Sequence, residues 1–247
     1  MSSNIPVVNL PNLYVDNLQA NWASTTTYTL AAGAALDSLG VNDIVLSTGV
    51  TINGAVLGAN GLDIGALANT TWYYVYVIGS SFNSALSAGL ISASATAPTL
   101  PSGYDVFRLV GITLTDGSAH FLKSYCGGNS KYRYHVWDAN ISVLSGGTSA
   151  SLAASDLSSA VPPINLTPVQ IEVNFTPATA NDTASFAPFG STATLLPHIA
   201  GSVAAKVNSG QLKIISKLDT ATPKILYINS AASGSTTVWV SGFEYFI

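Results

Sequence analysis

The chain contains 247 residues, of which 8% are charged, against roughly 25% in an average soluble domain, and its formal net charge is -4. With no basic excess to neutralise phosphates, this composition argues against a nucleic-acid-binding protein. Hydrophobic residues make up 48% of the chain, which is enough for a core and argues against a disordered chain. The length allows one large all-β domain or two small ones.

Neither the N-terminus nor the least charged stretch has the pattern of a targeting or membrane segment. The first residues, MSSNIPVVNL, have no basic n-region and no long apolar segment, so no classical signal peptide is expected. No charge occurs between Asp63 and Asp105, but Ser, Asn, Thr and Gly interrupt this stretch throughout. Because a membrane-spanning helix needs about 20 consecutive apolar residues, we expect no membrane insertion.

Strand-forming residues dominate the chain, which contains only two Glu and one Met. Trp72–Ile78 reads WYYVYVI and predicts a strand that ends at Gly79. Later runs alternate between two faces, as a half-buried strand does, and they cover residues 131–137, 169–175, 212–217 and 238–243. In the last run, the alternation places Trp239, Ser241 and Phe243 on one face.

Turn-forming pairs separate these runs, and Asp116-Gly117 is the clearest hairpin signal. Short helices are expected only at Leu62–Ala68 and at Ala153–Ala160, where Ser155 or Asp156 is the candidate N-cap. Many short strands between turns predict an all-β fold, with β-sandwich or jelly-roll-like subdomains and few short helices.

The composition changes between Leu144 and Pro163, where the chain is rich in Gly, Ser, Ala and Pro. We expect an N-terminal β domain at residues 1–144, a connection at residues 145–163 and a C-terminal β domain at residues 164–247. The alternative is one continuous sandwich in which this segment is an exposed connection.

Residue types that carry catalysis or bind metals are sparse. The three histidines have no spacing that would make a local metal-ligand pair, and Asp63 lacks the further acids of a calcium loop. The one cysteine, Cys126, excludes an intramolecular disulfide and has no basic cluster nearby to activate it. The chain contains no GxSxG elbow and no phosphate-binding loop. We therefore expect no catalytic, cofactor-binding or metal-binding residues, and no enzyme.

The aromatic residues are the feature that could bind a ligand or a partner. Rings on strands either pack in a core or subunit interface with their polar tips bonded, or form an exposed platform for sugar rings. Both interpretations apply to the candidates Trp72, Tyr74, Tyr132, Tyr134 and Trp137.

Residues 58–125 resemble a known class of protein. They include GANGLDIGAL, TWYYVYVIG and SATAPTLPSGYDVFR (Ser94–Arg108). These strings are similar to segments of tail-fibre and other virion proteins of tailed bacteriophages, and a looser similarity covers most of the chain. The resemblance implies a location in the virion and supplies no catalytic residues.

We therefore expect a non-enzymatic structural protein of a tailed-phage virion, a tail-fibre or surface-appendage component that assembles with other virion proteins. We expect a homo-oligomer, because a surface with so few charges exposes apolar residues that contacts between subunits would bury. The resemblance favours a trimer. A capsid decoration or cement protein is an alternative, because the heptads and long repeats of fibre shafts are missing. A carbohydrate-binding module that binds host surface glycans through Trp72 and Tyr132 is a second alternative, and a glycan-cleaving spike enzyme is the weakest.

Overall fold

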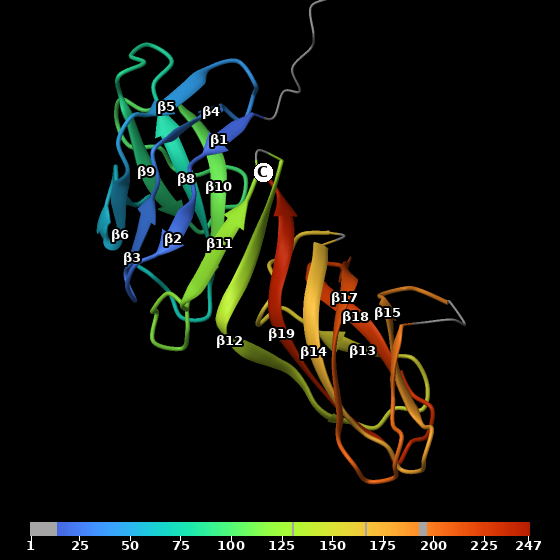
Figure 1. Ribbon diagram of the computed structural model, residues 1–247. Coiled ribbons are helices and arrows are strands. Elements are labelled where there is room, and N and C mark those ends of the chain that lie inside the picture. The colour runs from blue at the N-terminus through green and yellow to red at the C-terminus, as the bar shows by residue number, and fades with distance from the viewer. Residues whose placement is uncertain (1–13, 130, 166, 193–196) are drawn as a thin grey trace, which may run out of the picture. The chain divides into compact units, whose positions relative to one another are not determined.

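The computed structural model describes residues 14–129, 131–165, 167–192 and 197–247 (Figure 1). Within these residues it contains nineteen strands and no helix, so the predicted all-β class is confirmed. No helix of this part of the chain has the length and apolarity to cross a membrane. The chain divides into two compact units, which are described separately. Unit 1 comprises the described residues up to Phe121 with Gly128–Arg133 and Ile247, and unit 2 comprises Leu122–Gly127 and Tyr134–Phe246.

Unit 1 consists of a three-stranded sheet, in the order β1-β4-β5, and a seven-stranded sheet, in the order β10-β8-β9-β7-β6-β3-β2. Pairing is antiparallel except where β7 lies parallel to β6 and to β9. The strands are β1 (Val15–Asn17), β2 (Ala20–Trp22), β3 (Thr27–Leu30), β4 (Gly33–Leu36), β5 (Asp43–Leu46), β6 (Val50–Leu57), β7 (Gly61–Leu62), β8 (Trp72–Gly79), β9 (Ser87–Ser92) and β10 (Val106–Leu114).

Strand β8 is the centre of the core of unit 1, because every residue after Trp72 in it is buried. The seven-stranded sheet curls until its outer strands approach each other. At Gly111 of β10, next to a bulge after Leu109, a Cβ atom would lie 2.7 Å from the Cβ of Ala20 in β2. Glycine and a bulge are what allow such close approach of two backbones.

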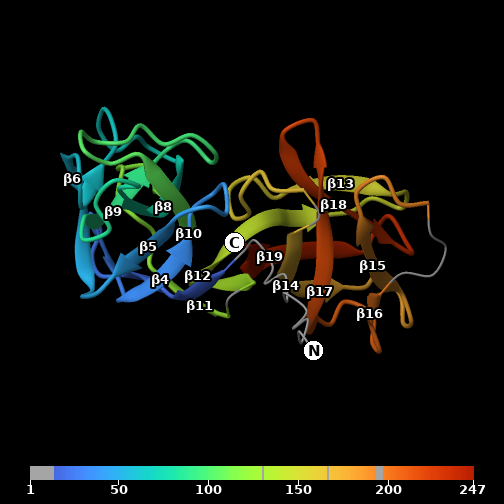
Figure 2. The same ribbon diagram turned by 90° about the horizontal axis from the view of Figure 1, so that it is seen from above.

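Unit 2 is built on one sheet in the order β11-β12-β19-β14-β17-β18-β15-β16, with β13 also paired to β18 (Figures 1 and 2). The hairpin end of β11 and β12, Gly128–Arg133, groups with unit 1. The strands are β11 (Ser124–Gly128), β12 (Tyr132–Gly147), β13 (Ala153–Asp156), β14 (Thr167–Thr176), β15 (Thr183–Pro188), β16 (His198–Ala200), β17 (Asn208–Asp219), β18 (Thr222–Asn229) and β19 (Ser235–Phe246).

This sheet also curls, and the buried side chain of Asn229 marks where its strands meet. Its amide donates to the carbonyls of Gly147 at the end of β12 (2.9 Å) and of Gly234 (2.8 Å). Its carbonyl oxygen accepts from the hydroxyl of Thr236 (2.6 Å). One amide therefore connects β12, β18 and the start of β19 inside the unit.

The predicted alternation is confirmed in β12, β14 and β17 and fails within β19. Val169 to Phe175 and Lys213 to Lys217 alternate as expected between buried and outward positions. In β19 the register passes from Val240 opposite Ile171 to Gly242 opposite Gln170, so Ser241 is an extra, unpaired residue. This bulge reverses the phase of the strand, and Phe243 is therefore buried instead of sharing the outward face of Trp239.

Both predicted short helices are wrong. Leu62 ends β7, and the carboxylate of Asp63 holds the segment that comes next. It accepts hydrogen bonds from the N–H groups of Ile64 and Thr99 and from the hydroxyl of Ser92. Ala153–Asp156 forms β13, because β18 supplies its backbone with hydrogen-bond partners. The predicted hairpin at Asp116-Gly117 is a turn closed by a single antiparallel bridge, Thr115 to Phe121.

Residues 145–163, predicted from the sequence to be a connection, lie within unit 2. They contain the end of β12 and all of β13, followed by a turn in which the N–H of Val161 donates to the carbonyl of Leu157 (2.8 Å). The division into domains at residues 1–144 and 164–247 stays a prediction.

Candidate functional site

The five predicted aromatic candidates occupy different environments. Tyr74 and Trp137 are buried, and the indole N–H of Trp137 donates to the carbonyl of Ala160 (3.0 Å). Trp72 is half-buried at the start of β8. Tyr132 and Tyr134 lie on the outward face of β12 and are 39% and 45% exposed. The five rings therefore do not form one platform, and Tyr134 is the candidate that borders a hollow in unit 2.

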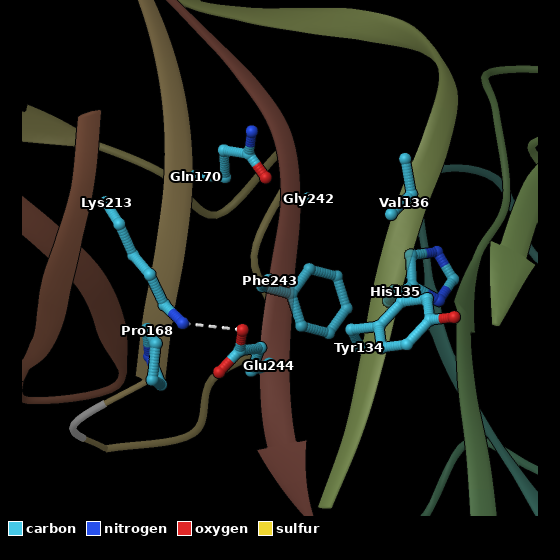
Figure 3. A pocket seen from close by; sticks show the side chains of 9 residues that line it. All are labelled: Tyr134, His135, Val136, Pro168, Gln170, Lys213, Gly242, Phe243 and Glu244. Carbon is cyan, nitrogen blue, oxygen red and sulfur yellow. Dashed lines mark hydrogen bonds and ion pairs between the residues drawn. The ribbon is translucent and has the colours of Figure 1, made fainter. Parts of the chain in front are cut away.

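This hollow has a volume of about 50 Å³ and lies at Gly242 of β19, between β12 on one side and β14 and β17 on the other (Figure 3). Its rim consists of the outward residues of these strands, and the buried rings of His135 and Phe243 contribute to its lining. The complete lining is Tyr134, His135, Val136, Pro168, Gln170, Lys213, Gly242, Phe243 and Glu244.

The bulge in β19 explains why a hollow exists here. Gly242 lies opposite Gln170, whose side chain is outward, so a side chain at position 242 would fill this part of the face. Glycine is required, because a Cβ atom would lie 2.4 Å from the carbonyl oxygen of His135 on β12. The backbones of β12 and β19 therefore approach closely, and the face above them stays empty.

One ion pair borders the hollow. The ammonium of Lys213 on β17 lies 2.6 Å from a carboxylate oxygen of Glu244 on β19 (Figure 3). The side chain of Lys213 is 59% exposed, so the pair adds little stability. The ion pair does leave the rim of the hollow without a net charge.

His135 is a buried imidazole next to a thiol. Its ring stacks on Phe243 with a centroid distance of 4.8 Å and meets the edge of Trp137 at 4.3 Å. Burial lowers the pKa of His135 from 6.5 to about 3, so the ring is neutral at ordinary pH. Its Nδ1 atom lies 3.7 Å from the sulfur of Cys126, whose sulfur also lies 3.6 Å from the hydroxyl of Tyr245.

A catalytic cysteine pair needs a third group that orients the base. Within the described residues, Nε2 of His135 is buried and has no hydrogen-bond partner, so no side chain orients the ring in that way. The cluster of Cys126, His135 and Tyr245 therefore has the geometry of core packing.

Beside the hollow, a network of amides surrounds one carboxylate on the outward face. Glu172 on β14 accepts from the amide of Asn140 on β12 (2.5 Å) and from the amide of Gln211 on β17 (2.8 Å). Trp239 on β19 lies directly opposite Glu172 in the sheet register. None of these four residues is predicted as a ligand site from the sequence. The outward alternation of β14 and β19 is the only sequence signal that points to them.

A second hollow, of about 510 Å³, lies in unit 1 beside Asp63. The carboxylate of Asp63 accepts from the hydroxyl of Ser92 (2.6 Å) and from the N–H groups of Ile64 (2.8 Å) and Thr99 (3.1 Å). These bonds hold together the loops that line the hollow. In the described part of the chain, no three His, Cys, Asp or Glu side chains gather where they could hold a metal ion.

No protein family model matches the chain, and no curated protein matches its sequence. Among solved structures, a chain in the structure of the infectious bursal disease virus Gx strain is 14% identical, with a TM-score of 0.20 over 93% of this chain and 65% of that chain. A chain in the crystal structure of the T13 particle of the same virus is 13% identical, with a TM-score of 0.25 over 94% of this chain and 69% of that chain. This chain thus spans about two thirds of the length of those viral chains, and the similarity is too distant to assign a family.

Proposed function

We propose that this chain is a non-enzymatic structural component of a virus particle, which acts by assembling with copies of itself and with other virion proteins. The observation that carries the proposal is the exposure of large apolar side chains in a chain with few charges. In unit 1, Leu39 is 81% exposed, Val41 is 73% exposed and Phe82 is 93% exposed. Soluble monomers rarely gather such side chains on their surface, so a partner that covers them is the simplest explanation.

Hydrogen bonds to one carboxylate hold the turn that carries Leu39 and Val41. The carboxylate of Asp37 accepts from the N–H groups of Leu39 (3.2 Å) and Val41 (2.8 Å) and from the amide of Asn42 (2.7 Å). Burial alone would raise the pKa of Asp37, but these hydrogen bonds outweigh it and lower the pKa. The turn therefore presents two apolar side chains in a defined arrangement, as an interface requires.

Phe82 lies at the same end of unit 1. The N–H of Ser38, in the turn, donates to the carbonyl of Phe107 near the start of β10 (2.8 Å). The N–H of Ser81, next to Phe82, donates to the carboxylate of Asp105, just before β10 (2.7 Å). Since both loops attach to the start of β10, we call Leu39, Val41 and Phe82 the apolar end of unit 1.

The finer assignment, a tail-fibre or surface-appendage protein of a tailed phage in the form of a homotrimer, is supported by the resemblance of residues 58–125. A capsid decoration protein would use the same apolar end to bridge capsid subunits. The apolar end supports assembly in either location, and it supports no catalytic role.

Light scattering on the purified chain tests the proposal. We expect a species of about three times 25.4 kDa at micromolar concentration, and the double variant Leu39→Asp/Val41→Asp should lower the mass. The matched control, Thr25→Asp/Ser118→Asp, adds the same two charges at exposed positions elsewhere in unit 1 and should keep the wild-type mass. A monodisperse wild-type mass near 25.4 kDa would refute self-assembly.

A further inference from the structure

Trp239 presents an aromatic ring on the outward face of unit 2. Its neighbours along β19, Val238 and Val240, are completely buried, so Trp239 points to the opposite face of the sheet. It is half-buried, because the strands on both sides carry side chains that flank it. An indole held in this way offers a flat apolar surface on which another ring can stack.

The groups that flank Trp239 are amides held in place by one carboxylate. Glu172 binds the amide of Asn140 through one oxygen and the amide of Gln211 through the other. Each amide uses one N–H for Glu172, and a side-chain amide carries a second N–H and a carbonyl. The network therefore fixes two amides beside an aromatic ring, and each amide has both a donor and an acceptor left for hydroxyl groups.

The charged residues of the site itself are compensated locally. Glu172 accepts two amide hydrogen bonds, and Lys213 and Glu244, which line the hollow, form an ion pair 2.6 Å long. A phosphate or a sulfated ligand would need unpaired cations here. A ligand with many hydroxyl groups and no charge fits the face best.

The hollow at Gly242 extends the same face along β19. Trp239 and Gly242 are three residues apart on the strand, which corresponds to about 10 Å. Tyr134, 45% exposed, forms part of the far rim of the hollow. An occupant that contacts both Trp239 and the hollow must be longer than a single ring.

From these observations we propose that the outward face around Trp239, Asn140, Glu172 and Gln211, together with the hollow at Gly242, binds a neutral oligosaccharide. One sugar ring stacks on Trp239, and its hydroxyls bond to the two amides. The next sugar rings extend toward Gly242 and Tyr134. This activity goes beyond the assembly role proposed above and does not depend on it.

The test uses the full chain and three neutral probes: maltohexaose, cellohexaose and N-acetylchitohexaose. We expect at least one of them to bind with a Kd below about 1 mM by calorimetry. Trp239→Ala should weaken that binding about tenfold, the loss expected for a stacked ring, and Gln211→Ala should weaken it by a smaller factor. Tyr14→Ala removes an exposed ring from unit 1, outside the apolar end, and should leave the Kd unchanged.

Failure to bind any of the three probes at about 10 mM would overturn the proposal. So would an unchanged Kd in Trp239→Ala, or an equal loss in Tyr14→Ala. If circular dichroism shows that Trp239→Ala does not fold, Trp239→Phe and Gln211→Ala test the proposal in its place. Trp239→Phe should keep most of the affinity, and Gln211→Ala should lose part of it. A lower mass of Trp239→Ala in light scattering, with unchanged sugar binding, would identify the face as a contact between copies of the chain and refute sugar binding there.

Discussion

The buried imidazole of His135 makes a quantitative prediction about stability and pH. The ring is 1% exposed, and burial lowers its pKa from 6.5 to about 3. A group whose folded-state pKa is depressed binds its proton more tightly in the unfolded state. Its neutral form therefore stabilises the fold fully above pH 6.5, and this contribution is lost as the pH falls from 6.5 toward 3.

The size of the effect follows from the two pKa values. Between pH 7.5 and pH 4.5 the difference in proton binding at His135 lowers the free energy of unfolding by about 2–3 kcal/mol. His135→Gln cannot take up this proton, so the variant should lose about 2–3 kcal/mol less than the wild type over the same interval, whatever its stability at pH 7.5.

Urea denaturation at pH 7.5 and pH 4.5, followed by tryptophan fluorescence, measures this difference. The ring of Trp137 lies 4.3 Å from that of His135 and is buried, so its emission reports on the unfolding of this core. His198→Gln, at an exposed position of the same unit, is the matched control and should retain the wild-type loss. If wild type and His135→Gln lose stability equally between the two pH values, the reasoning about burial is refuted.

Two further substitutions test the packing described above. Gly242→Ala should lower the free energy of unfolding by about 1–3 kcal/mol, because the new Cβ would lie 2.4 Å from the carbonyl oxygen of His135. Gly117→Ala, where a Cβ meets nothing within 4 Å, should change stability by under about 1 kcal/mol, and equal losses in both would contradict the close approach. Asn229→Ala should cost about 3 kcal/mol in urea denaturation, because two buried carbonyls and a hydroxyl lose their partner. Asn69→Ala, at an exposed position, should be nearly neutral, and a neutral Asn229→Ala would show that water replaces the amide.

Much of the fold could be predicted from the sequence because the period of two is a local property. The alternation in β14 and β17 and the buried run of β8 follow directly from the order of apolar and polar residues. The two helix predictions failed for a different reason. Ala153–Asp156 has little strand propensity, and its conformation depends on pairing with β18, about 70 residues later in the chain.

The candidate site was harder to predict, because it depends on cross-strand register. Trp239 and Glu172 are opposite each other only because β14 pairs with β19, and Asn140 and Gln211 come from two further strands. The bulge at Ser241, which leaves Gly242 on the outward face, has no signature in a single sequence beyond the glycine itself. The predicted aromatic set therefore included Tyr134 and missed Trp239.

The curl of the seven-stranded sheet of unit 1 also bears on how this protein avoids aggregation. A strand at the edge of a sheet carries unpaired N–H and C=O groups that can recruit another chain, and many proteins block such edges with lysine or other charges. With 8% charged residues, this chain has few charges to place there. Its sheet instead brings the long edge strand β10 up against β2, an edge strand of only three residues, at Gly111 and Ala20. Curvature takes the place of electrostatic repulsion, and uncharged surface remains available for the contacts that assembly requires.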